Sequence, residues 1–138
     1  MRRYLGLLFT YRSREGTVAW LFHRISGLAI WAFLVLHVLD IYLVGDNPGA
    51  YDDILRFYAS PVGRVLEVLL GAALLYHALN GLRIVIIDLW PSMAQYHKVL
   101  WRASWVIFIL LGLPGAAIIL LPLYRDSLTS LLHTLGIN

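Results

Sequence analysis

The sequence contains no cysteine in its 138 residues, and this absence excludes several kinds of site. Disulfides, zinc–thiolate sites, ligation of an iron–sulfur cluster and thioether attachment of a c-type haem all require cysteine. Histidine is therefore the only strong nitrogen ligand that the chain offers. The histidines are His23, His37, His77, His97 and His133.

Charged residues are also scarce. They make up 14% of the chain, whereas about 25% is usual in a soluble domain, and 60% of the residues are hydrophobic. This balance indicates a membrane protein. The net charge of +3 is modest, so we expect no nucleic-acid partner. The chain also lacks the GxxxxGK pattern of a phosphate-binding loop.

Three long apolar segments dominate what remains, and each is close to the roughly 20 residues that cross a bilayer as a helix. We therefore predict an all-α membrane protein with three transmembrane helices, as part of a helix bundle. Pro91 should end the second helix, and Pro114 and Pro122 should kink the third. The predicted single domain, residues 1–138, has helices at about residues 20–44, 64–90 and 101–123, and a short interfacial helix at about residues 51–58.

The basic residues set the expected orientation, because cytoplasmic flanks of membrane helices are enriched in lysine and arginine. The second loop carries Lys98 and Arg102 and no acidic residue. We expect a cytoplasmic N-terminus and second loop, with the first loop and the C-terminus outside. The N-terminal flank carries Arg2, Arg3, Arg12, Arg14 and Arg24.

The segment "YHALNGLRIVIIDLW", residues 76–90, places polar groups in an apolar helix. An ionisable residue there is costly and is a functional candidate by default. His77 should lie roughly 18 Å from the outer end of its helix. Gly81, one turn later on the same face, leaves room for a flat macrocycle. Two interpretations stay open from spacing alone: a haem ligand, or a hydrogen-bonded histidine in a small-residue packing contact.

His37 is a separate candidate on the first predicted helix. It follows His23 by roughly 21 Å along the helix axis, so it should lie near the outer third of the membrane. Asp40 follows one turn later and could orient its ring. Because His37 and His77 differ in depth, they should not share one iron. His37 is either a ligand of a second haem or a hydrogen-bonding residue near the interface.

A third group should gather at the cytoplasmic ends of the first two helices. His23, Arg24 and Ser26 begin the first helix, and Arg83 and Asp88 end the second. One interpretation is structural: the arginines reach the head groups, and Asp88 neutralises one of them. The other is a polar cup that binds haem propionates or a quinone.

Two motifs carry a family resemblance. "FHRISG", residues 22–27, resembles the H-R-x-S/T-G element of the cytochrome b subunit of succinate dehydrogenase, the C subunit of complex II. "HALNGLRIVIID", residues 77–88, resembles the second signature of that family, in which histidine is followed by glycine, arginine and aspartate. The resemblance covers about residues 11–123 and has the motifs in the right order.

The resemblance implies a cofactor and its ligands. His77 matches the axial ligand of haem b, and the other ligand would come from a second membrane anchor subunit. Arg83 matches an arginine near a haem propionate. His23 matches a histidine linked to both haem propionate and quinone. One haem b is expected, and His37 raises a two-haem arrangement.

The resemblance also implies a quinone site, with one departure. Arg24 matches an arginine near the quinone, and His23 is its neighbour. The family often has a serine three residues before this pair, where this chain has Trp20. Either Ser26 or another subunit would then replace that contact. The quinone would be ubiquinone or menaquinone.

The implied function is that of a subunit of succinate:quinone oxidoreductase which is not catalytic by itself. Electrons would arrive through a flavoprotein subunit and an iron–sulfur subunit and leave to membrane quinone, in the bacterial cytoplasmic membrane. Alternatives are the anchor of a quinol:fumarate reductase, a haem-free membrane scaffold, and a small transporter with His37, Asp40 and Asp88 as a proton relay. Three helices leave little room for a transport pathway.

Overall fold

The computed structural model describes residues 14–46 and 48–135, and this part of the chain is helical almost throughout. It has no β-strand, which confirms the predicted all-α fold class. The elements are α2 (Arg14–Asp46), α3 (Pro48–Ala59), α4 (Pro61–Leu89), the 3₁₀ helix η1 (Pro91–Tyr96) and α5 (His97–Thr134).

Three segments are long and apolar enough to cross a membrane, as predicted. They are Gly16–Gly45, Pro61–Leu89 and Pro91–Thr134. The helices extend beyond the apolar segments from which they were predicted. The largest difference is in α5, which continues to Thr134, well past the predicted end at residue 123.

The boundaries around α4 follow from local chemistry. Ser60 caps its N-terminus, and its Oγ accepts a hydrogen bond from the Gly63 amide at 3.1 Å. Pro61 follows in the first turn, where a missing N–H costs nothing. Pro91 begins η1 directly after Trp90, and it ends the second membrane helix at the predicted place.

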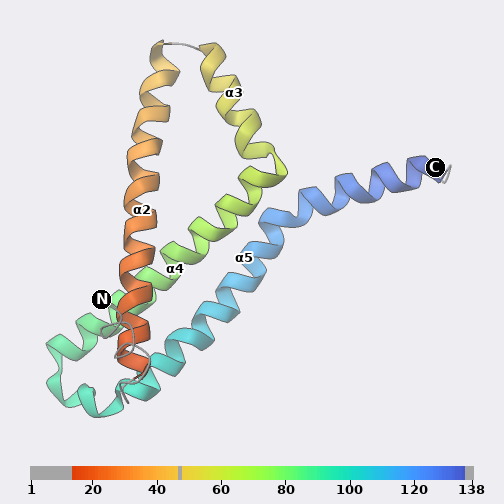
Figure 1. The fold of residues 1–138 in the computed structure, drawn as a ribbon. Helices are drawn as coiled ribbons and strands as arrows, with labels where there is room; N and C mark the ends of the chain where they lie inside the picture. The colour runs from red at the N-terminus through yellow and green to blue at the C-terminus, as the bar shows by residue number, and fades with distance from the viewer. Residues whose placement is uncertain (1–13, 47, 136–138) are drawn as a thin grey trace, which may run out of the picture.

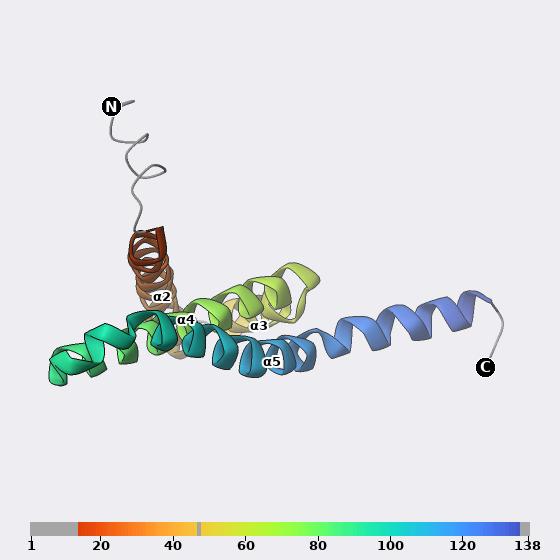
Figure 2. The ribbon, with the colours of Figure 1, turned by 90° about the horizontal axis from the view of Figure 1, so that it is seen from below.

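The helices form an open arrangement rather than a closed bundle. In Figure 1, α2, α3 and α4 outline a triangle, with α2 and α4 crossing near the N-terminal part of α2. α5 runs along α4 in both views (Figures 1 and 2). Pro114 and Pro122 lie within α5, and its C-terminal part turns away from the other helices. At the crossing, the N-terminal part of α2 meets the middle of α4, around Tyr76 and His77, rather than its C-terminal end, where the two ends had been expected to meet.

The described chain buries very little of its own apolar surface. Ala19 is its only buried hydrophobic residue, and the large apolar side chains along all three spans are exposed. An exposed apolar surface of this extent marks contact with lipid or with another protein. The chain therefore takes its stability from the bilayer and from neighbouring helices rather than from an internal core.

One polar contact fixes the amphipathic helix α3 against α2. The Tyr58 hydroxyl donates a hydrogen bond to Asp40 Oδ2 at 2.6 Å. The same carboxylate raises the pKa of the Tyr58 phenol, because it accepts the phenolic proton and, together with partial burial, opposes a second negative charge. The contact therefore persists at neutral pH and is lost as the pH rises through this raised pKa.

This pKa can be measured from the phenolate absorbance of the purified protein. Subtracting the titration of Tyr58→Phe from that of the unmodified protein should leave a midpoint above the ordinary value of about 10. Asp40→Asn should lower that midpoint, because it removes the carboxylate charge. Tyr51→Phe, on the same helix, is the matched control. A Tyr58 midpoint that does not move in Asp40→Asn would contradict the contact.

Candidate functional site

The crossing of α2 and α4 is built around two histidines. The rings of His23 on α2 and His77 on α4 stack with centroids 4.0 Å apart and planes 8° from parallel. The sequence places His23 at the cytoplasmic end of the first helix and His77 within the second, without predicting a contact between them. The structure brings them together because α2 and α4 cross at this level.

A second contact holds the His77 ring in one orientation. Its Nδ1 lies 3.1 Å from the backbone carbonyl oxygen of His23 and 3.3 Å from Ser26 Oγ. A carbonyl oxygen can only accept, so the proton of the neutral ring must be on Nδ1. The Ser26 hydroxyl donates to the same carbonyl at 3.0 Å. His77 Nε2 is thereby left with a free lone pair, the form in which histidine binds a metal.

Two glycines permit the close approach of the helices. A Cβ atom on Gly27 would lie 2.9 Å from His77 Cε1 and 3.3 Å from its Nδ1, closer than side chains tolerate. A Cβ on Gly81 would lie 3.6 Å from His23 Cε1, an ordinary contact. We expected Gly81 to lie beside His77. It lies instead beside His23, and Gly27, from the first motif, is the glycine against His77.

Three buried polar atoms in the described residues have no hydrogen-bond partner: His23 Nδ1, Arg83 Nε and Trp101 Nε1. Arg83 is close enough to act electrostatically on His23. Buried polar groups are nearly always paired, so unpaired ones call for a partner from outside the chain. The Arg83 and Trp101 atoms are N–H donors, and they would be satisfied by acceptors such as carboxylate or carbonyl oxygens.

An aromatic cluster on α4 and α5 borders the histidine pair. Tyr76 packs against Phe22, Trp105 and Phe108, with centroids 5.8, 5.6 and 6.2 Å from its own. Its hydroxyl donates to the Ala19 carbonyl at 3.4 Å. Sequence analysis did not single out Tyr76 as a site residue. The only signal was its position next to His77 in the polar segment.

The residues predicted to bind quinone fall into two groups. His23 and Ser26 lie within the crossing, and Ser26 is only 6% exposed. Trp20 and Arg24 lie on the exposed surface of α2, where the Arg24 guanidinium sits 4.0 Å from the Trp20 ring centroid. The cation–π contact orders an arginine whose donors face outward.

Most of the chain matches a known protein family. Residues 3–119 match the family described as "Succinate dehydrogenase/Fumarate reductase transmembrane subunit". The chain belongs to this family. It is 37% identical over 109 residues to the succinate dehydrogenase 2 membrane subunit SdhC of Mycobacterium tuberculosis, covering 79% of this chain and 80% of that protein.

More distant relatives come from archaea. The succinate dehydrogenase hydrophobic membrane anchor subunit of Halobacterium salinarum is 32% identical over 84 residues, which is 60% of this chain and 65% of the relative. The anchor subunit of Archaeoglobus fulgidus is 30% identical over 71 residues, 51% of this chain and 61% of the relative. The chain is therefore a multi-pass membrane anchor subunit of the succinate dehydrogenase type, part of an enzyme complex and not itself catalytic.

His37 lies apart from the histidine pair of this anchor subunit. It is exposed on α2, roughly 21 Å along the helix from His23, and it stacks on Phe33 with a centroid distance of 5.4 Å. It also lines a cavity of about 290 Å³, together with Tyr58 and Glu67. The expectation that His37 and His77 cannot share one iron is consistent with this separation.

Among the described residues, Asp88 forms no ion pair with an arginine, whereas the structural interpretation of the charged rim expects one. The only ion pair in the part of the chain that the structure describes joins Arg56 to Asp53 at 3.8 Å on the exposed side of α3. The described residues also contain no cluster of three or more histidine, aspartate or glutamate side chains that could hold a metal ion. A metal here would need ligands from a macrocycle or another subunit.

The contact of Gly27 with His77 can be tested in the assembled complex. Gly27→Ala should destabilise it by about 1–3 kcal/mol, the usual cost of forcing an extra group into a packed site. Gly71→Ala is the matched control, since a Cβ there meets nothing within 4 Å. Thermal unfolding of the two variants measures the difference. Equal stability would contradict the close packing at the crossing.

Proposed function

We propose that this anchor subunit binds haem b and quinone, and passes electrons from an iron–sulfur subunit to membrane quinone. The observation that carries the proposal is the contact of His77 Nδ1 with the His23 carbonyl oxygen at 3.1 Å, which calls for a proton on Nδ1 and so leaves the Nε2 lone pair free. The same arrangement, with one ring nitrogen on a backbone carbonyl, orients histidine ligands in metalloproteins generally. The family resemblance assigns the axial-ligand role to this same residue.

The surrounding residues fit the haem that the family implies. Arg83 has a buried Nε–H without a partner, which suits a propionate carboxylate. His23 supplies a second unpaired ring nitrogen beside it. Gly27 and Gly81, which lack side chains, let the two histidine rings pack closely at the crossing. When bound, haem b would supply a one-electron acceptor between the iron–sulfur subunit and the quinone.

Haem b would need a second protein ligand besides His77, and His23 does not fit that role. The His23 and His77 rings stack face to face with centroids only 4.0 Å apart, which would leave no room for a haem between them. His37 lies too far along α2. The second ligand therefore comes from a second anchor subunit in this proposal.

The quinone would lie near the N-terminal part of α2. The Arg24 guanidinium, ordered on Trp20, can donate to a quinone carbonyl and stabilise the negative charge that forms on its oxygen during reduction. Ser26 and His23 lie on the neighbouring face of the same helix and could hold the second carbonyl or a proton. Because the N-terminus would lie on the cytoplasmic side of a bacterial cytoplasmic membrane, this site would take its protons from the cytoplasm. The substrate is ubiquinone or menaquinone.

Two variants of the proposal remain. The same anchor would serve a quinol:fumarate reductase if the electrons ran in reverse, since the direction depends on the quinone and the other subunits. His37 would ligate a second haem nearer the outer surface, beside the cavity that it lines. A scaffold without haem is the competing function, and in it the unpaired Arg83 and Trp101 donors would have to be satisfied by another subunit alone.

The haem proposal predicts the optical spectrum of the purified complex. His77→Leu should abolish the reduced-minus-oxidised b-type absorption, because it removes the axial ligand. His133→Leu, in the exposed end of α5, should leave the absorption intact. A loss of half the absorption in His37→Leu would establish the second haem. Unchanged absorption in His77→Leu, with succinate-to-dye activity retained on the membrane, would contradict the assignment.

The quinone proposal predicts a split between two activities. Arg24→Ala should slow quinone reduction at least about tenfold, since a lost charge-assisted hydrogen bond costs about 1.5–3 kcal/mol. Electron transfer from succinate to a soluble dye should be unchanged, because it bypasses the anchor. Arg56→Ala, an exposed arginine on α3, is the control. An equal loss of both activities would indicate failed assembly and contradict a specific role for Arg24.

A further inference from the structure

The C-terminal part of α5 is longer than a membrane crossing requires. α5 has 38 residues, which corresponds to about 57 Å at 1.5 Å per residue. The hydrocarbon core is only about 30 Å thick. The continuous apolar sequence ends at Leu123, directly after Pro122. Both views show the rest of the helix running away from α2, α3 and α4 (Figures 1 and 2).

This terminal segment, residues 121–135, is amphipathic. Five of its seven large apolar residues recur at intervals of three and four, so these five form one stripe along the helix. Each side chain of the stripe is at least half exposed. The stripe consists of Leu121, Tyr124, Leu128, Leu131 and Leu135. The opposite side carries the polar residues Arg125, Thr129, Ser130, His133 and Thr134.

The polar side of the segment needs no protein partner. The hydroxyls of Ser127, Thr129 and Thr134 donate to backbone carbonyls one turn earlier, at 2.8, 2.9 and 2.8 Å. The segment also carries no net formal charge. Its only formally charged residues are Arg125 and Asp126, and their charges are opposite. The polar side of the segment can therefore lie in water. Because the segment has no net charge, it does not need a charged surface as its partner.

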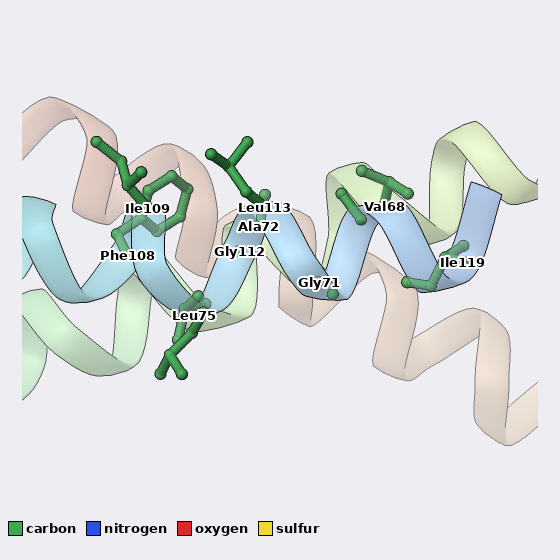
Figure 3. Close-up of a pocket in the computed structure, with 12 residues that line it drawn as sticks. Val68, Gly71, Ala72, Leu75, Phe108, Ile109, Gly112, Leu113 and Ile119 are labelled. Atoms are coloured by element: carbon green, nitrogen blue, oxygen red, sulfur yellow. The ribbon is translucent and has the colours of Figure 1, made fainter. Parts of the chain in front are cut away.

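The apolar side is also hollowed where the segment leaves the span. A cavity of about 390 Å³ is lined by Ala117, Leu120, Leu121, Tyr124, Arg125 and Leu128. It begins within the membrane-spanning part of α5 and continues onto the stripe. The exposed apolar surface of the span is thus continuous with the stripe. A second, separate cavity between α4 and α5 is lined by residues that include Gly71, Gly112 and Ile119 (Figure 3).

We propose that residues 121–135 form an interfacial helix that lies on the membrane surface, with the apolar stripe among lipid acyl chains and the hydroxyl-rich side in water. Acyl chains fill the hollow at its start, as lipid does along the exposed span. Tyr124 and Arg125 lie at the level of the head groups, where such side chains anchor membrane helices. The family match ends at residue 119, before this segment begins. If the C-terminus lies outside, as the basic residues predict, this surface is that of the outer leaflet. The rest of the proposal does not depend on that orientation.

The absence of cysteine makes a direct test possible. Each residue from 121 to 135 is replaced by cysteine in turn and spin-labelled in the whole complex, reconstituted in phosphatidylcholine vesicles. Collisions with oxygen, which concentrates in lipid, and with a water-soluble nickel chelate are then measured. We expect the two accessibilities to oscillate out of phase with a period of about 3.6 residues. Oxygen maxima should fall at 124, 128 and 131, and nickel maxima at 129, 130 and 133.

The other outcomes overturn the proposal. A stripe that is shielded from both reagents would show that a protein helix covers it. Access of nickel to every position would show that the segment projects into water. The complex that contains the unmodified, cysteine-free chain is treated with the spin label in the same way. Its signal measures labelling of the other subunits. Repeating the scan with phosphatidylglycerol added should leave the pattern unchanged, and a pattern that needs the anionic lipid would contradict binding through the apolar stripe.

Discussion

The hydrogen bond from His77 Nδ1 to the His23 carbonyl is the contact on which the site depends. An imidazole in a bilayer must find a partner for its N–H, because water is absent. Here the neighbouring helix provides one from its backbone, and the His23 ring covers one face of the imidazole. Because the ring cannot turn without losing both contacts, the remaining nitrogen points in a fixed direction. Gly27 allows this only because it has no side chain.

The same geometry explains why this chain is one part of a larger assembly. Its spans bury almost none of their apolar side chains, and buried donors on Arg83 and Trp101 lack partners within the described residues. The stacked histidines cannot bind one iron from opposite sides. In the proposed function, one addition would complete each of these features: a second set of membrane helices that packs against α2 and α4 and supplies the missing ligand.

Sequence alone could predict the three spans, the stop at Pro91 and the meeting of the first and second helices, because these depend on apolar length, proline and topology. It could not predict that Gly81 faces His23 while Gly27 faces His77. Helical periodicity gives the residues of one face, but the angle at which two helices cross decides what that face meets. The length of α5 was missed because its last turns are amphipathic, and a count of apolar residues ends at Leu123. Nor could the sequence predict that the indole nitrogen of Trp101 is buried.

In the proposed function, His77 binds iron through Nε2 while Nδ1 keeps its hydrogen bond to the His23 carbonyl on α2. An electron cryo-microscopy map of the whole complex in lipid tests this most directly. It should show density for a haem whose iron is bonded to His77 Nε2 on one side and to a residue of another subunit on the other. The His23 carbonyl should remain within hydrogen-bond distance of Nδ1. Iron bound to His23 instead, or a His77 ring turned away from the α2 backbone, would contradict the account.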